Sequence, residues 1–136
     1  MQKIEHVGIA VENIKESEKL FALLFGVEPY KREIVEEQEV LTSFLRVGNN
    51  KIELLQATSK TSVIAKFLDK KGPGFHHLAF AVSDLKAEMQ RLKTAGFSLL
   101  QEEPSKGADN KIVCFLHPKS TGGILVELVQ NLIKTE

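Results

Sequence analysis

Two histidines and two glutamates recur at matching places in the two halves of this chain. His6 lies in the stretch IEHVGIAV, and His77 occupies the same place in FHHLAFAV. Glu53 and Glu127 likewise occupy the same place in IELLQ and VELVQ. Imidazole nitrogens and carboxylate oxygens are ligands that divalent metal ions accept together. The repeat therefore predicts one metal site with His6, Glu53, His77 and Glu127 as its ligands.

The residues beside each histidine support this prediction. Side chains two positions apart on a strand point to the same face, so His6 shares a face with Gly8 and Ala10, and His77 likewise has alanines on its side. Small neighbours leave room for an ion and a substrate. His76 points to the opposite face, which favours His77 as the ligand.

Glu53 and Glu127 stand among apolar neighbours, where an unpaired carboxylate is expensive to bury. A bound cation would remove this cost. A lone histidine or glutamate is more simply interpreted as a polar position on a half-solvated sheet, but the duplication of both residue types favours the metal site.

Each half predicts a strand, a helix and three further strands. In the first half, Asn13 is an N-cap and Gly26 a C-terminal stop for a helix over 14–25 with the apolar stripe Ile14, Phe21, Leu24 and Phe25. The strands of this half are expected at 4–11, 30–36, 40–47 and 51–56. In the second half we expect strands at 75–82, 98–101, 111–117 and 124–129 and a helix at 84–95.

These elements predict an α+β fold. Two repeated βαβββ modules form one curved mixed β-sheet, with helices on the convex face and the metal site in the concave cleft. Residues 1–130 make a single domain, with module 1 at about 3–57, a connector helix at about 61–72 and module 2 at about 74–130. Residues 131–136 are a C-terminal tail.

Composition excludes several classes of partner. The 136 residues carry 18 basic and 18 acidic side chains, so no net positive field attracts nucleic acid or an anionic membrane. No apolar run resembles a signal segment or a membrane span, which favours a cytoplasmic location. The one cysteine, Cys114, lies in an apolar run and is expected to be a small buried hydrophobic residue.

The repeated residues carry a resemblance over nearly the whole chain. The sequence resembles the vicinal oxygen chelate superfamily, which includes glyoxalase I, methylmalonyl-CoA epimerase and extradiol dioxygenases. Three stretches are most similar to the methylmalonyl-CoA epimerases: KIELL with the later SVIAKFL, GFHHLAF, and HPKSTGGILVEL. The resemblance implies a paired βαβββ fold and a divalent metal ion held by the same four residues that the repeat selects.

The resemblance also implies a reaction. The epimerases interconvert the (R) and (S) forms of methylmalonyl-CoA by moving the α-proton through an enolate that a divalent metal stabilises. Glu127 would act as a base, and pseudo-twofold symmetry would place Glu53 on the other side of the metal as the second. Some family members take an acid from the third strand instead, where this chain has Thr42, with Glu39 a few residues earlier.

A second group of polar residues is expected to bind substrate. Lys119, Ser120 and Thr121 precede Gly122-Gly123, and their ammonium, hydroxyl and amide groups could hold the substrate carboxylate or a coenzyme A phosphate. His117, before Pro118, is interpreted as loop structure.

The sequence thus predicts a metal-dependent methylmalonyl-CoA epimerase, an isomerase that acts on an acyl-CoA. The metal could be cobalt, manganese, nickel or zinc. Relatives are commonly homodimeric, so we expect a homodimer, with no nucleic acid or membrane partner. Glyoxalase I, which uses the same ligand types on a glutathione hemithioacetal, is the alternative enzyme, and a non-catalytic small-molecule binding module is the alternative of another class.

Overall fold

The computed structural model describes residues 1–132. The chain divides into two compact units, and each holds most of one sequence repeat. Unit 2 is His6–His76, whereas unit 1 combines Met1–Glu5 with the chain from His77 onward. Of the predicted C-terminal tail, residues 133–136 lie outside the described part of the chain, and Asn131 ends the last strand.

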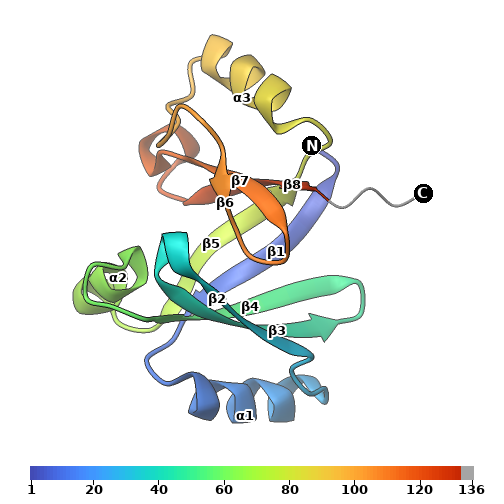
Figure 1. The fold of residues 1–136 in the computed structure, drawn as a ribbon, viewed down its shortest axis with the longest axis vertical. Helices are drawn as coiled ribbons and strands as arrows, with labels where there is room; N and C mark the ends of the chain where they lie inside the picture. Colours follow the sequence, from blue (N-terminus) through green and yellow to red (C-terminus); the bar gives the residue numbers. More distant parts are fainter. Residues whose placement is uncertain (133–136) are drawn as a thin grey trace. The chain divides into compact units, whose positions relative to one another are not determined.

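Unit 2 contains the helices and strands of the first repeat. Along the chain they are β1 (Lys3–Ala10, from His6 onward), α1 (Ile14–Phe25), β2 (Lys31–Val35), η1 (Glu36–Gln38), β3 (Val40–Val47), β4 (Asn50–Ala57) and α2 (Val63–Lys71). The strands follow the order β2-β3-β4-β1, with β1 parallel to β4 and the other pairs antiparallel. Helix α1 packs beside β3 and β4 (Figure 1).

Unit 1 repeats this arrangement with the second half of the chain. Its elements are β5 (Gly74–Ala81, from His77 onward), α3 (Leu85–Thr94), β6 (Ser105–Lys106), β7 (Lys111–Leu116), η2 (Pro118–Thr121) and β8 (Val126–Asn131). The order β5-β8-β7-β6, with β5 parallel to β8, is the counterpart of the order in unit 2. Helix α3 packs beside β7 and β8 (Figure 1). The predicted pair of βαβββ modules is confirmed.

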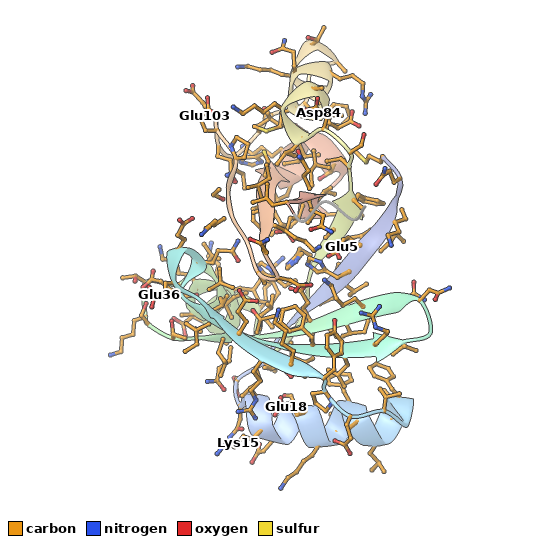
Figure 2. The ribbon with its side chains drawn as sticks, turned by 45° about the vertical axis from the view of Figure 1, so that its right-hand side comes forward. Glu5, Lys15, Glu18, Glu36, Asp84 and Glu103 are labelled. Carbon is orange, nitrogen blue, oxygen red and sulfur yellow. The ribbon has the colours of Figure 1, made fainter. Side chains whose placement is uncertain are left out.

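The two sheet-covering helices begin in the same way. The Asn13 side chain accepts a hydrogen bond from the amide of Glu16, and the Asp84 side chain accepts one from the amide of Ala87, each at 3.1 Å. Asp84 marks the start of α3 in Figure 2. Since an N-cap oxygen satisfies an amide that has no partner within the helix, both helices start at the residue after the cap. The end of α1 at Gly26, with a φ of 71°, is also as predicted.

The apolar stripe of α1 is narrower than expected. Ile14 is buried, and Phe21 and Phe25 pack against a cluster that includes Leu45 and Leu54. Leu24, however, is 68% exposed. The predicted face was therefore wrong at this one position, because Leu24 lies outside the strip along which Ile14, Phe21 and Phe25 meet the core.

The strand expected at 98–101 is reduced to a bridge between Leu99 and Leu116. The reason lies in Gln101, whose side chain occupies the place that further backbone pairing would take. Its oxygen accepts a hydrogen bond from the Phe115 amide at 3.3 Å, and its amide group donates to the Val113 carbonyl at 3.4 Å. The edge strand β6 forms only later, at Ser105–Lys106.

None of the helices within residues 1–132 has the length and apolar character needed to cross a membrane.

Candidate functional site

In unit 2, His6 and Glu53 form a buried pair. His6 comes from β1 and Glu53 from β4, which pairs with β1 in parallel so that Glu53 lies beside Gly8. His6 Nδ1 lies 3.1 Å from Glu53 Oε2. Each residue is only 5% exposed. The parallel register therefore brings together two predicted ligands that are far apart in the sequence.

In unit 1, His77 and Glu127 form the equivalent pair. His77 comes from β5 and Glu127 from β8, where Glu127 lies beside Ala79. His77 Nε2 lies 3.0 Å from Glu127 Oε1, and both residues are buried. Gly8 and Ala79 thus hold the same place in the two units, each opposite the glutamate of its unit.

Each of the two pairs, taken by itself, has donor atoms that suit a divalent metal ion. Ligand atoms about 2.0–2.2 Å from one ion lie roughly 3 Å from each other, which is close to the separation within each pair. Imidazole and carboxylate together suit cobalt, manganese, nickel or zinc. Burial adds to the fit, because a carboxylate removed from water gains most from a nearby cation.

Sequence reasoning missed Lys51, whose ammonium group contacts the His6–Glu53 pair. Lys51 lies on β4 and is 6% exposed, and its Nζ lies 3.7 Å from Glu53 Oε2. A lysine two residues before a glutamate shares its strand face, and this spacing was the signal available in the sequence.

The other two histidines lie elsewhere, as predicted. The His76 ring meets the Phe67 ring of α2 edge-on, with ring centres 4.9 Å apart. His117 caps η2, where its Nδ1 accepts a hydrogen bond from the Lys119 amide at 3.1 Å. His117 is therefore part of the loop structure.

The predicted substrate loop is the η2 turn and the glycines after it. The Ser120 hydroxyl accepts a hydrogen bond from the Ser98 amide at 2.9 Å, and the Thr121 hydroxyl bonds the carbonyls of Pro118 and Ile124. Lys119 is exposed. Both hydroxyls thus shape the turn, and the lysine is the group of this loop that projects into solvent.

Thr42 and Glu39, the positions considered for a second proton-transferring acid, are not part of either His–Glu pair. Thr42 is 1% exposed on β3, opposite Leu55. The Glu39 carboxylate accepts hydrogen bonds from the hydroxyls of Ser59 and Thr61. These bonds, first of all the one from Ser59, lower the pKa of Glu39. Glu39 is therefore engaged in holding the chain that follows β4.

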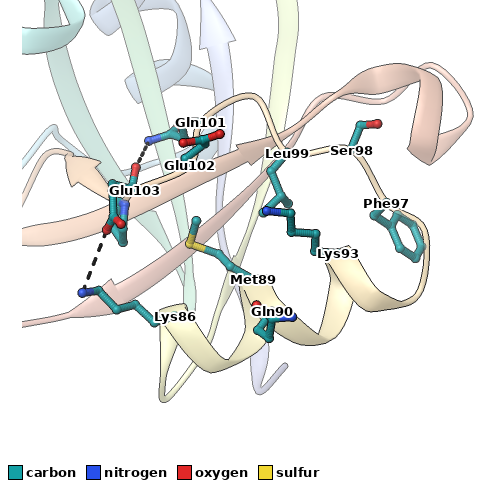
Figure 3. A pocket seen from close by; sticks show the side chains of 11 residues that line it. Lys86, Met89, Gln90, Lys93, Phe97, Ser98, Leu99, Gln101, Glu102 and Glu103 are labelled. Atoms are coloured by element: carbon teal, nitrogen blue, oxygen red, sulfur yellow. Dashed lines mark hydrogen bonds and ion pairs between the residues drawn. The ribbon is translucent and has the colours of Figure 1, made fainter.

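A separate hollow in unit 1 contains none of the predicted site residues. It lies between α3 and the chain after it, with Met89, Phe97 and Leu99 among its apolar residues and Lys86 and Lys93 among its charged ones (Figure 3). Lys86 Nζ lies 4.0 Å from Glu103 Oε2 across this hollow.

Comparison with known proteins assigns this chain to a family. Residues 5–115 match the model of the glyoxalase/bleomycin resistance protein/dioxygenase superfamily. An ethylmalonyl-CoA/methylmalonyl-CoA epimerase of Cereibacter sphaeroides is 38% identical over 94% of this chain and 97% of its own length. An uncharacterized protein of Bacillus subtilis, YqjC, is 36% identical over 96% of this chain and 93% of its own.

A solved structure agrees with these relatives. The crystal structure of methylmalonyl-CoA epimerase from Mycobacterium tuberculosis matches with a TM-score of 0.92 and 38% identity, over 96% of this chain and 89% of that one. The predicted α+β class is confirmed. The chain belongs to the glyoxalase/bleomycin resistance protein/dioxygenase superfamily, with methylmalonyl-CoA epimerases among its relatives.

Proposed function

We propose that this protein is a methylmalonyl-CoA epimerase that interconverts the (R) and (S) epimers. The observation that carries the proposal is the buried His–Glu pair present once in each unit, at His6–Glu53 and His77–Glu127. The epimerase relatives supply the substrate class, and an epimerase is an isomerase.

The four residues of the two pairs are proposed to hold one divalent metal ion. Enzymes of this superfamily bind such an ion, and the donors of each pair suit cobalt, manganese, nickel or zinc. When bound, the ion would act as a Lewis acid that stabilises the negative charge of the enolate oxygen.

Glu127 is the proposed base. The α-carbon of methylmalonyl-CoA lies between a thioester carbonyl and a carboxylate, so its C–H bond is acidic enough for a carboxylate to break. Glu127 would take this proton while the bonding electrons move toward the thioester oxygen. Return of a proton to the other face completes the epimerisation.

The second face requires a second proton carrier, and Glu53 is the proposed one. The repeat gives Glu53 and Glu127 equivalent places on β4 and β8. Thr42 has no carboxyl group, and the Glu39 carboxylate accepts hydrogen bonds from Ser59 and Thr61. These two observations favour Glu53 over either residue.

The η2 loop is the proposed contact for the acyl-CoA anion. Lys119 offers an exposed ammonium, while Ser120 and Thr121 hold the turn in shape. A cytoplasmic location and a homodimer remain predictions, and sedimentation of the purified protein would test the dimer.

Glyoxalase I is the alternative enzyme, because the same histidines and glutamates would serve enolate chemistry on a glutathione hemithioacetal. A binding module is the alternative without catalysis. The test measures turnover of methylmalonyl-CoA and of the glutathione hemithioacetal separately, each with the cobalt-loaded protein. Epimerisation of methylmalonyl-CoA supports the proposal, and turnover of the hemithioacetal alone supports glyoxalase I. Absence of activity with both substrates supports the binding module.

A further inference from the structure

Lys51 is a buried lysine whose ammonium group lies against Glu53. Its Nζ is 3.7 Å from Glu53 Oε2 and 5.4 Å from the centre of the Phe44 ring. Phe44 faces Glu53 across the β3–β4 pairing. Because a buried ammonium is expensive unless an anion or an aromatic face offsets the loss of water, these contacts fix where Lys51 lies.

Two groups thus meet the same oxygen of Glu53. His6 Nδ1, from β1, lies 3.1 Å from Oε2, and Lys51 Nζ, from β4 itself, lies 3.7 Å away. All three residues are at most 6% exposed. A carboxylate held from two strands in this way has little freedom to rotate.

At the equivalent place in unit 1 the chain has a leucine, which carries no ammonium group. Leu125 occupies the place before Glu127 that Lys51 occupies before Glu53. Phe115 faces Glu127 as Phe44 faces Glu53, but the Phe115 ring meets the His77 imidazole edge-on, with ring centres 5.8 Å apart. The two glutamates therefore stand in equivalent places with different surroundings.

We propose that Lys51 is a positioning residue that orients the Glu53 carboxylate as a metal ligand. This inference rests on the metal centre of the proposed function. Partner groups around a metal-ligating side chain fix its direction, and their loss commonly weakens metal binding or activity about 10–100-fold. Lys51 would be such a partner through its ion pair with Glu53. Because unit 1 has Leu125 at the equivalent place, this role is confined to unit 2.

The test measures cobalt affinity by titration calorimetry on the full chain, together with the visible absorption of the cobalt-loaded protein. We expect Lys51→Met to weaken binding about 10–100-fold and to change the spectrum. Lys51→Arg should keep more of the affinity than Lys51→Met, because it retains charged donors. Leu125→Met is the matched control in unit 1 and should bind cobalt as the wild type does.

A double-mutant cycle shows whether Lys51 acts through Glu53. Lys51→Met should cost much less affinity when Glu53→Gln is already present, and equal losses in both backgrounds would overturn the proposal. Cobalt binding by Lys51→Met that equals or exceeds the wild type would also overturn it, since a lysine that merely repels the cation gives that result. If circular dichroism shows that Lys51→Met does not fold, Lys51→Gln replaces it.

These outcomes are separate from those of the proposed function. A wild type that binds cobalt but does not epimerise methylmalonyl-CoA contradicts the proposed function, while the affinities still decide the role of Lys51. A wild type that binds no cobalt overturns both. Active enzyme with no effect of Lys51→Met on affinity or spectrum overturns only the role of Lys51.

Discussion

His77 Nε2 lies 3.0 Å from Glu127 Oε1, with both residues buried on adjacent parallel strands. The neighbouring histidine, His76, instead packs its ring against Phe67. Two adjacent residues of the same type thus have different surroundings, because alternate side chains of a strand point to opposite faces.

His77→Ala is expected to abolish tight cobalt binding, because it removes one of the proposed imidazole ligands. His76→Ala is the matched control, one residue away, and should bind cobalt with the wild-type affinity. Titration calorimetry of both variants measures the difference. Equal affinities in the two variants would remove His77 from the metal centre.

Glu127→Gln should lower the rate of α-proton exchange about 10²–10⁴-fold, because an amide cannot accept the proton as a carboxylate does. The amide oxygen can still ligate a metal ion, so metal should remain measurable in the variant by elemental analysis. NMR in heavy water follows the exchange. Retention of the wild-type rate would exclude Glu127 as the base.

Gln56→Leu and Gln130→Leu should each destabilise the protein by about 1–3 kcal/mol. The Gln56 side chain accepts a hydrogen bond from the Ile14 amide at 2.7 Å, and Gln130 accepts one from the Leu85 amide at 2.8 Å. Each substitution leaves a first-turn amide without its acceptor. Urea unfolding measures both, and a large loss in one variant alone would show that the two contacts are not equivalent.

Glu18 should make stability depend on acid pH. Glu18 lies on α1, where Figure 2 labels it. Its carboxylate binds the Arg32 guanidinium and accepts a hydrogen bond from Ser43 at 2.6 Å, and the bond from Arg32 is the main cause of its lowered pKa. A carboxyl with a lowered folded-state pKa contributes stability above its unfolded pKa and loses it as the pH falls through the folded value.

Glu18→Gln should therefore reduce stability at pH 7 by about 1 kcal/mol and leave a flatter profile below about pH 4.5. Chemical unfolding at a series of pH values measures both effects. The same acid dependence in Glu18→Gln and the wild type would assign it to other carboxyls.

Cys114 should react slowly with thiol reagents in the folded protein. It is fully buried in β7, and burial raises its pKa to about 11, so the thiolate is scarce at pH 8. Labelling with iodoacetamide at pH 8 should become fast only when denaturant is added. Rapid labelling without denaturant would contradict this burial.

The repeat made most of the fold predictable. Two helices with caps at Asn13 and Asp84 and seven of the eight strands follow from periodicity and turn residues. The exception is the expected strand at 98–101, where Gln101 replaces backbone pairing with side-chain hydrogen bonds. Periodicity cannot reveal such a replacement, because Gln101 fits the strand pattern.

The candidate site was predictable where it repeats and was missed where it does not. His6, Glu53, His77 and Glu127 recur, and each unit pairs its histidine with its glutamate. The place of Lys51 is taken by Leu125 in the second half of the chain, so comparing the halves gave no reason to select it. Its contact with Glu53 depends on burial and on the Phe44 ring, which only the packed structure shows.

The most direct test is α-proton exchange of methylmalonyl-CoA in heavy water, followed by NMR on apo and cobalt-loaded protein, with a glutathione hemithioacetal as the parallel substrate. The account predicts deuterium uptake that depends on cobalt and accompanies interconversion of the epimers. No uptake by the cobalt-loaded protein, with or without turnover of the hemithioacetal, would contradict it.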